Sequence, residues 1–311
     1  NGSLQSNKTT LHPGTNQNDK RNSDGMPYKN VCQKCGAIRV DKQIGLEQTP
    51  DLYVADMVQV FREVWRVLRD DGTVWLNLGD SYVSNTGDRN KVGGFQANPN
   101  KDRLLAESAM SFNKKSGNLK SKDLIGIPWM VAFALRADGW YLRQDIIWHK
   151  PNPMPESVKD RCTKAHEYIF LLTKSARYWY DNEAVKEKAN YDGRNDEIYK
   201  GGDKDQSCFS HKRWSKNEDG VRVRNKRSVW CVPTKPYSGA HYAVFPPDLI
   251  EPCILAGCPE GGVVLDPFIG SGTTAMVARK HGRHAIGLDL NFDYLNTNAR
   301  KRLQYGSFIP I

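Results

Sequence analysis

The apolar residues between positions 54 and 68 recur every three or four positions, the spacing of one face of an amphipathic helix. Thr49 is suited to cap this helix, and Pro50 suits its first position, where a missing N–H has no cost. The helix ends at the Asp-Asp-Gly of residues 70–72. The pattern therefore predicts one long helix in this part of the chain.

The periodicity of shorter apolar segments predicts further helices and strands. We expect strands at 73–78, 141–148, 167–173, 228–230, 263–266 and 284–289, and helices at 124–137, 247–256, 275–278 and 291–303. Because strands alternate with helices, the sequence indicates an α/β fold with a mainly parallel sheet.

Polar segments divide the chain into four parts. Residues 1–43 are rich in Asn, Lys, Gly and Ser, which is typical of disordered or loop-like sequence. Residues 44–181 and 229–311 are expected to form the two halves of one domain. A charged segment at 182–228 separates them as a basic insertion, and 83–120 is a second polar insertion without periodicity.

The composition points to a polyanionic partner. The 311 residues carry a formal net charge of +10, which favours nucleic acid, although a generic basic protein remains the alternative. Seven scattered cysteines argue against a disulfide framework and for a reducing cytoplasm. We find neither a signal peptide nor an apolar run long enough to span a membrane. The chain lacks an initiator Met, so a fragment or a processed product is expected.

The most informative segment is 263–274, where a β-branched strand ends in Asp266 and leads into a glycine-rich turn and a helix. Such a unit brings backbone N–H groups and a helix N-terminus close to a ligand. Residues 270–275 also match the dinucleotide fingerprint, with Asp289 as the ribose acid. A dinucleotide fold needs several more β–α units after its fingerprint, whereas here the other strands come before it.

Several segments together resemble the beta group of DNA amino-methyltransferases, which methylate N4 of cytosine or N6 of adenine. The motifs that carry the resemblance are, in chain order, residues 72–82, 147–153, 245–250, 266–274 and 287–289. The resemblance covers residues 44–305. It implies an α/β, Rossmann-like methyltransferase fold with permuted strand order and polar insertions, and S-adenosylmethionine (SAM) as cofactor.

The resemblance also assigns cofactor-binding residues. The strand-end acid and the glycine turn would flank the methionine part of SAM, Asp289 would bind the ribose, and the segment at 245–246 would lie against the methionine end. The expected cofactor-binding residues are Asp266, Pro267, Phe268, Gly270, Ser271, Gly272, Thr273, Asp289, Phe245 and Pro246. As alternatives from the residues alone, Asp289 could cap the next helix, and Thr273 and Thr274 could cap the helix that they begin.

In this family a tetrapeptide of the Ser/Asp-Pro-Pro-Tyr type holds the amino group of a flipped base for direct methyl transfer. This chain has no such tetrapeptide, because its one Pro-Pro, at 246–247, follows Phe245 and precedes Asp248. We therefore expect an N-terminally truncated methyltransferase whose catalytic segment lies upstream of Asn1. Cytosine C5 chemistry would need a Pro-Cys nucleophile, but Cys253 is expected to be a buried helix residue.

Two further groups of residues are expected to contact the target. Asn77, Asp80, Trp148, Lys150 and Asn152 would support the target pocket, although Trp148 could simply belong to the core and Asp80 could start a turn. The expected DNA-binding residues are Arg213, Trp214, Arg222, Arg224, Lys226 and Arg227, with a solvated basic loop as the alternative.

Cys32 and Cys35 resemble half of a zinc knuckle, so a structural zinc ion is expected in the intact protein. The leading hypothesis is a site-specific DNA methyltransferase of a bacterial or phage restriction–modification system. Its partners would be double-stranded DNA and a cognate restriction enzyme. The alternatives are a nicotinamide-dependent (NAD) oxidoreductase and an inactive DNA-binding fragment that retains a SAM site.

Overall fold

The computed structural model describes residues 44–83, 119–189, 215–216, 219–235, 244–290 and 294–303. The chain separates into two compact units, Asn1–Leu46 and Glu47–Ile311. All the helices and strands described below belong to the second unit. Among the described residues, no helix is both long and apolar enough to cross a membrane.

The first helix, α1 (Pro50–Val67), confirms the predicted helix and its cap. The Leu52 N–H donates to Thr49 Oγ1 at 3.2 Å, and Pro50 occupies the first turn. Tyr53, Met57 and Phe61 are buried, so the predicted apolar face is the one that packs on the rest of the domain.

Four strands form the central sheet in the order β1-β3-β2-β7. These are β1 (Thr73–Leu78), β2 (Tyr141–His149), β3 (His166–Thr173) and β7 (Val229–Cys231). Strand β3 runs antiparallel to both β1 and β2, whereas β7 is parallel to β2. The expectation of a mainly parallel sheet is therefore corrected to a mixed sheet. Residues 150–165 join β2 to β3 without a helical crossover, and neighbouring strands joined in this way run antiparallel.

Helix α3 (Ile127–Ala137) begins three residues later than the apolar pattern predicts. Gly126 adopts a left-handed conformation, with φ of 84°, and Leu124 forms a β-bridge with Tyr82. The segment before Gly126 is thereby extended rather than helical. This geometry matters for the site, because it brings the first turn of α3 to the end of β1.

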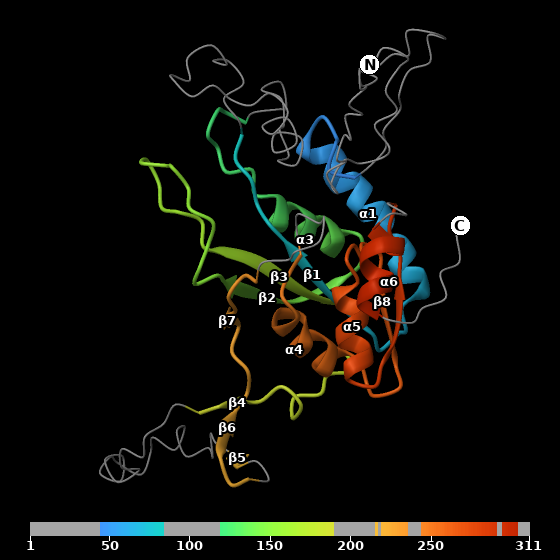
Figure 1. Cartoon of the computed structure of the whole chain (residues 1–311). Coiled ribbons are helices and arrows are strands. Elements are labelled where there is room, and N and C mark those ends of the chain that lie inside the picture. The colour runs from blue at the N-terminus through green and yellow to red at the C-terminus, as the bar shows by residue number, and fades with distance from the viewer. Residues whose placement is uncertain are drawn as a thin grey trace, which may run out of the picture. The chain divides into compact units, whose positions relative to one another are not determined.

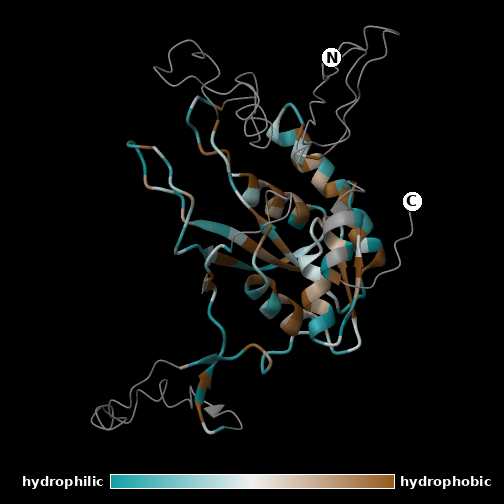
Figure 2. Ribbon diagram, viewed as in Figure 1, coloured by the Kyte–Doolittle hydropathy of each residue, from teal (hydrophilic) through white to brown (hydrophobic). Residues whose placement is uncertain are grey.

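Helices cover both faces of the central sheet (Figure 1). On one face, Trp129 of α3 packs against Tyr168 and Phe170 of β3, with ring centroids 5.6 and 5.1 Å apart. On the other face, Ile169 lies in a buried cluster with Leu249 and Cys253 of α4 (Pro247–Gly257). Hydrophobic residues are frequent in the strands of this sheet (Figure 2).

A second, parallel sheet carries the glycine turn. It consists of β8 (Val263–Asp266) and β9 (His284–Gly287), with α5 (Thr273–Lys280) between them in sequence. Helix α4 packs on α5 through Ile254, Val277 and Ala278. The predicted single helix at 291–303 is corrected to two short pieces among the described residues, a π-helix η3 (Tyr294–Ala299) and α6 (Arg300–Leu303).

The basic insertion contains strands that its polar sequence does not predict. β4 (Glu187–Lys188), β5 (Ser215–Lys216) and β6 (Arg222–Arg224) form a small antiparallel sheet in the order β4-β6-β5. Period-2 patterning cannot reveal strands of two or three residues, because so few positions alternate.

Candidate cofactor site and target pocket

Asp266 organises the glycine turn from the end of β8. Its Oδ1 accepts the Phe268 N–H at 2.9 Å, and its Oδ2 accepts the Thr274 hydroxyl at 2.5 Å. The carboxylate therefore joins the first and the last part of the turn. Gly270 and Gly272 adopt positive φ of 49° and 80°, a region that favours glycine and lets the chain reverse within a few residues.

Asp289 approaches the same turn from the neighbouring strand. Because Asp266 pairs with Gly287 in the parallel register, the two acidic residues follow adjacent strand ends. Asp289 Oδ2 accepts the Gly270 N–H at 2.9 Å. The carboxylate thus binds the glycine turn, a contact that neither of the roles expected for Asp289 includes.

The glycine turn brings two carboxylates, those of Asp266 and Asp289, close together. Burial raises the pKa of the Asp266 carboxyl above its ordinary value, the hydrogen bonds from Thr274 and Phe268 oppose this rise, and the charge of Asp289 adds to it. A cation next to Asp266 would offset both the desolvation of the ionised carboxylate and its repulsion by Asp289. The site therefore fits a positively charged ligand better than a phosphate group.

Arg302 of α6 holds the other side of the turn, a contact that the sequence analysis missed. Its Nη1 donates to Ser271 Oγ at 3.0 Å and to Thr273 Oγ1 at 2.8 Å. Ser271 and Thr273 are each only 3% exposed, so their hydroxyls need an internal partner. Among the described residues no side chain caps α5, and the hydroxyl of Thr274 binds Asp266 instead.

The other predicted cofactor residues lie next to these elements. Pro267 and the half-exposed Phe268 belong to the turn itself. Pro246 is the N-cap residue of α4, and Phe245 packs against the buried cluster below the central sheet. Their predicted contacts with the methionine end of the cofactor stay predictions.

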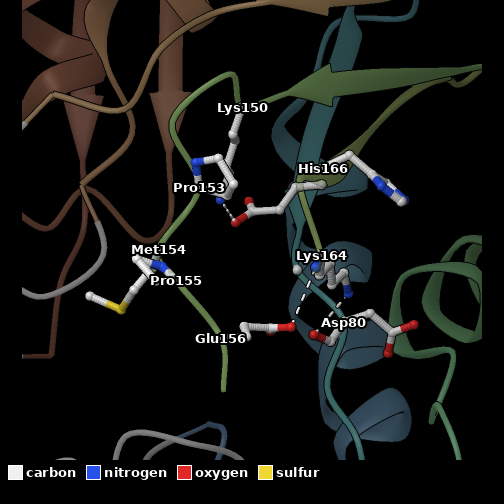
Figure 3. Close-up of a pocket in the computed structure, with 10 residues that line it drawn as sticks. Asp80, Lys150, Pro153, Met154, Pro155, Glu156, Lys164 and His166 are labelled. Atoms are coloured by element: carbon white, nitrogen blue, oxygen red, sulfur yellow. Dashed lines mark hydrogen bonds and ion pairs between the residues drawn. The ribbon is translucent and has the colours of Figure 1, made fainter. Parts of the chain in front are cut away.

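A separate pocket of about 260 Å³ opens where β1 and β2 end and β3 begins. Six titratable side chains line it, and they come from the strand ends and the loop between β2 and β3, as Figure 3 shows for Lys150, Glu156 and Lys164. They are Asp80, Lys150, Glu156, Lys164, His166 and Glu167.

Lys150 and Asn77 meet at Glu167 inside this pocket. Lys150 forms an ion pair with Glu167, and Asn77 Nδ2 donates to Glu167 Oε2 at 3.2 Å and to the Tyr168 carbonyl at 3.0 Å. Lys150 Nζ also lies 4.2 Å from the centre of the Trp148 ring. Two of the predicted pocket residues are therefore linked through a carboxylate that the sequence analysis did not select.

Trp148 itself is 4% exposed and belongs to the core beside Ile146 and Trp230. Its indole N–H donates to the Val232 carbonyl at 2.8 Å. This burial corresponds to the core alternative, and it leaves Trp148 as the support on which Lys150 rests.

Asp80 connects the pocket to α3. Its Oδ1 accepts the N–H groups of Ser81, Gly126 and Ile127 at 2.9, 2.9 and 3.1 Å. Lys164 Nζ donates to the Asp80 backbone carbonyl at 2.9 Å. The carboxylate thus caps the helix while its own backbone forms part of the pocket wall.

The predicted DNA-binding cluster is only partly within the described residues; Arg213 and Trp214 lie outside them. Arg224 and Arg227 both bind Glu187, at 2.9 and 2.6 Å, and these bonds hold the small sheet together. Lys226 Nζ lies 5.0 Å from the centre of the Trp230 ring, and Arg222 lies on β6 with an exposed side chain. DNA contact by these residues stays a prediction.

The cysteines of the described residues are free thiols and form no metal site. Cys32 and Cys35 lie outside the described residues, and within the described part no three His, Cys, Asp or Glu side chains gather as a metal site. Burial raises the pKa of the Cys253 thiol far above its ordinary value, so this residue is not a thiolate nucleophile.

Comparison with known proteins matches this arrangement to one family. The family model described as DNA methylase, N6_N4_Mtase, matches residues 15–300. The chain is 47% identical over 265 residues to the Type II methyltransferase M.Cfr9I of Citrobacter freundii, covering 85% of this chain and 76% of that protein. The Type II methyltransferase M.XycI of Xanthomonas campestris pv. cyanopsidis is 46% identical over 266 residues, with coverage of 85% and 76%.

Among solved structures, the PvuII DNA methyltransferase (cytosine-N4-specific) matches with a TM-score of 0.53 and 15% identity, covering 92% of this chain and 79% of that one. This likeness concerns the fold alone and agrees with the Rossmann-like methyltransferase fold. The family assignment rules out the nicotinamide-dependent oxidoreductase. The chain belongs to the N6_N4_Mtase family of DNA methylases and is an S-adenosylmethionine-dependent DNA methyltransferase.

Proposed function

We propose that this protein is the modification methyltransferase of a Type II restriction–modification system and methylates the exocyclic amine of a flipped base, at N4 of cytosine or N6 of adenine. The observation that carries the proposal is the Asp266 carboxylate, which is partly buried at a strand end and faces a second acid across the glycine turn. The chain thus offers a site suited to a cationic cofactor and a separate, polar pocket.

Bound S-adenosylmethionine supplies the methyl group for the reaction. Within the chain, Asp266 attracts the positive charge of the methionine end, and the 266–274 turn fixes the backbone around it. Asp289 holds Gly270 in place and would bind the ribose hydroxyls. Orientation and preorganised acceptors, rather than a protein nucleophile, would then account for the acceleration.

The pocket beside β1 and β2 would receive the target base after it leaves the duplex. Its walls offer hydrogen-bond acceptors on Glu167 and Asp80 and donors on Lys150 and Lys164. A base has donors and acceptors along its edge, so a mixed set of polar groups suits it better than an apolar cavity would.

The tetrapeptide that holds the amino group would come from outside residues 1–311. Pro246 and Pro247 begin α4 and cannot supply it. Among the described residues, β1 pairs only with β3 and β8 only with β9, so each has one edge available for another strand. A strand from a longer form of the protein, pairing with either edge, would carry the tetrapeptide to the site.

A methylation assay tests this function. Full-length protein that contains residues 1–311 should transfer labelled methyl groups from SAM to DNA, and mass spectrometry of the nucleosides would identify N4-methylcytosine or N6-methyladenine. The modified DNA should resist a restriction enzyme of the same sequence specificity. Residues 1–311 alone should bind SAM but not NAD in a thermal-shift titration, and should not methylate DNA.

Methylation by residues 1–311 alone would refute the missing tetrapeptide while leaving the enzyme class intact. SAM and DNA binding without methylation by the full-length protein would favour the alternative of an inactive DNA-binding protein that retains a SAM site.

Lys164 is expected to contact a DNA phosphate. Burial is the main cause that lowers the pKa of its ammonium, and among the described residues no carboxylate lies within ion-pair distance of Nζ. A phosphate would satisfy its remaining donors. We expect Lys164→Gln to weaken DNA binding and to reduce the slope of log Kd against log salt concentration by about one.

Two variants serve as controls for this slope. Lys164→Arg keeps the charge and should keep the slope. Lys122 is exposed and paired with Asp160, so Lys122→Gln should change neither the affinity nor the slope. Equal slopes for the wild type and Lys164→Gln would contradict the phosphate contact.

A further inference from the structure

The loop between β2 and β3 holds a methionine out in solvent at the edge of the charged pocket. The Met154 side chain is 87% exposed, the highest value among the exposed large hydrophobic side chains of the described residues. It lies between Pro153 and Pro155, and all three residues line the pocket. Met154 thus presents an unbranched apolar side chain to solvent at the edge of a pocket lined by charged groups.

The loop is tied to the segment after β7 on one side of Met154 and braced within itself on the other side. At one end, Asn152 Nδ2 donates to the Thr234 carbonyl at 3.0 Å, the Thr234 N–H donates to Asn152 Oδ1 at 2.9 Å, and the Thr234 hydroxyl donates to the Asn152 carbonyl at 3.3 Å. At the other end, Glu156 Oε2 accepts from Arg161 at 2.6 Å.

The two prolines stiffen the segment between these anchors, because each ring fixes φ and restricts the residue before it. Figure 3 shows the Met154 side chain pointing away from Asp80, Lys164 and His166, toward the outside of the pocket. The loop thus places polar groups inside the pocket and one long apolar group at its mouth.

We propose that Met154 inserts into the DNA duplex at the position that the target base leaves when it enters the pocket. This inference rests on the proposed function. Flipping a base leaves an unstacked gap between its two neighbours, and apolar side chains are known to act as wedges between base steps. A methionine suits the gap because its flexible thioether can lie against the faces of both neighbouring bases and of the orphan base.

The location supports insertion better than packing against the rest of the chain. Lys150 and Lys164 line the same pocket, where they would contact the phosphates or the flipped base. If the flipped base enters the pocket, the gap that it leaves in the duplex faces the mouth of the pocket. An apolar side chain at the mouth would therefore contact the stacked bases. Met154 then holds the duplex open while it takes no part in the chemistry.

The test compares normal and pre-opened DNA, using full-length protein. On a fully paired duplex, Met154→Gly should lower kcat/KM about 10- to 100-fold, since the cost of unstacking is no longer offset. On a duplex with an abasic site opposite the target base, the same variant should come within about threefold of the wild type. Met154→Leu should retain most of the activity on both substrates.

A fluorescent base analogue at the target position provides a second readout. Its emission should rise on binding to the wild type and much less on binding to Met154→Gly. Leu52→Ala, an exposed apolar residue of α1 far along the chain, serves as the control and should behave as the wild type.

Equal losses on paired and pre-opened DNA would overturn the insertion of Met154. A lower Tm or weaker SAM binding for Met154→Gly would also overturn it, since Met154 would then be a packing residue. If the wild type itself fails to methylate either substrate, the proposed function fails instead.

Discussion

Replacing Asp266 by Asn should severely weaken SAM binding without unfolding the protein. Asn can keep both local bonds, because its Oδ1 can accept the Phe268 N–H and its amide can donate to the Thr274 hydroxyl. What it cannot keep is the negative charge that faces a cationic ligand. Charge-assisted hydrogen bonds contribute about 1.5–3 kcal/mol, so we expect SAM affinity to fall roughly 10- to 150-fold or more.

The same substitution should leave the ligand-free protein at least as stable as the wild type. The pKa of Asp266 is raised in the folded state, chiefly by burial. A carboxyl with a raised folded pKa contributes stability below its unfolded pKa, and that contribution is lost as the pH rises through the folded value. At neutral pH the ionised Asp266 therefore opposes folding, and the neutral Asn removes this cost.

Calorimetric titration of SAM over a pH series, together with thermal melts without ligand, would check both effects. Wild-type affinity should decline on acidification at a pH above the ordinary carboxyl pKa of about 3.9, while Asp266→Asn should show no such dependence. Glu63→Gln removes an exposed charge on α1 and should match the wild type. Strong SAM binding by Asp266→Asn would disprove the electrostatic role of Asp266.

The features that the sequence predicted well depend on neighbours in the chain. The Thr49 cap of α1 and the turn after Asp266 both follow from contacts over eight residues or fewer. Local rules of capping and glycine conformation apply directly at such separations. For this reason the amino-acid sequence alone is enough to locate the glycine turn after Asp266.

The features that the sequence did not predict join distant segments. Arg302 reaches Ser271 over 31 positions, and Asn77 reaches Glu167 over 90. Glu187 binds Arg224 and Arg227 over 37 and 40 positions, so residues selected as DNA contacts also hold the small sheet together. No periodicity in the sequence encodes such pairs, because they depend on which strands become neighbours.

The sequence left open whether Asp80 supports the target pocket or starts a turn, and the structure adds the capping of α3 as a further role. Its Oδ1 accepts three backbone N–H groups, two of them at the start of α3, where a negative charge also interacts favourably with the helix dipole. Asp80→Ala leaves these donors without their acceptor. Because Ile127 is only 1% exposed, water cannot easily replace the carboxylate at its N–H. We expect a loss of about 2–4 kcal/mol in the free energy of unfolding, from about 1–3 kcal/mol for each buried unsatisfied group.

Chemical denaturation of three variants would measure this effect, and their kcat/KM would separate the capping of α3 from a contact with the flipped base. Asp181→Ala removes a single bond to the Ala184 N–H at an exposed site, so it should cost less than about 1 kcal/mol. Asp80→Asn keeps an acceptor for α3 and should be nearly as stable as the wild type. If Asp80 also binds the flipped base through its charge, Asp80→Asn will lower kcat/KM at unchanged stability, whereas full activity would leave helix capping as its role. A stable Asp80→Ala would contradict the capping geometry, because three N–H groups would then have lost their acceptor without cost.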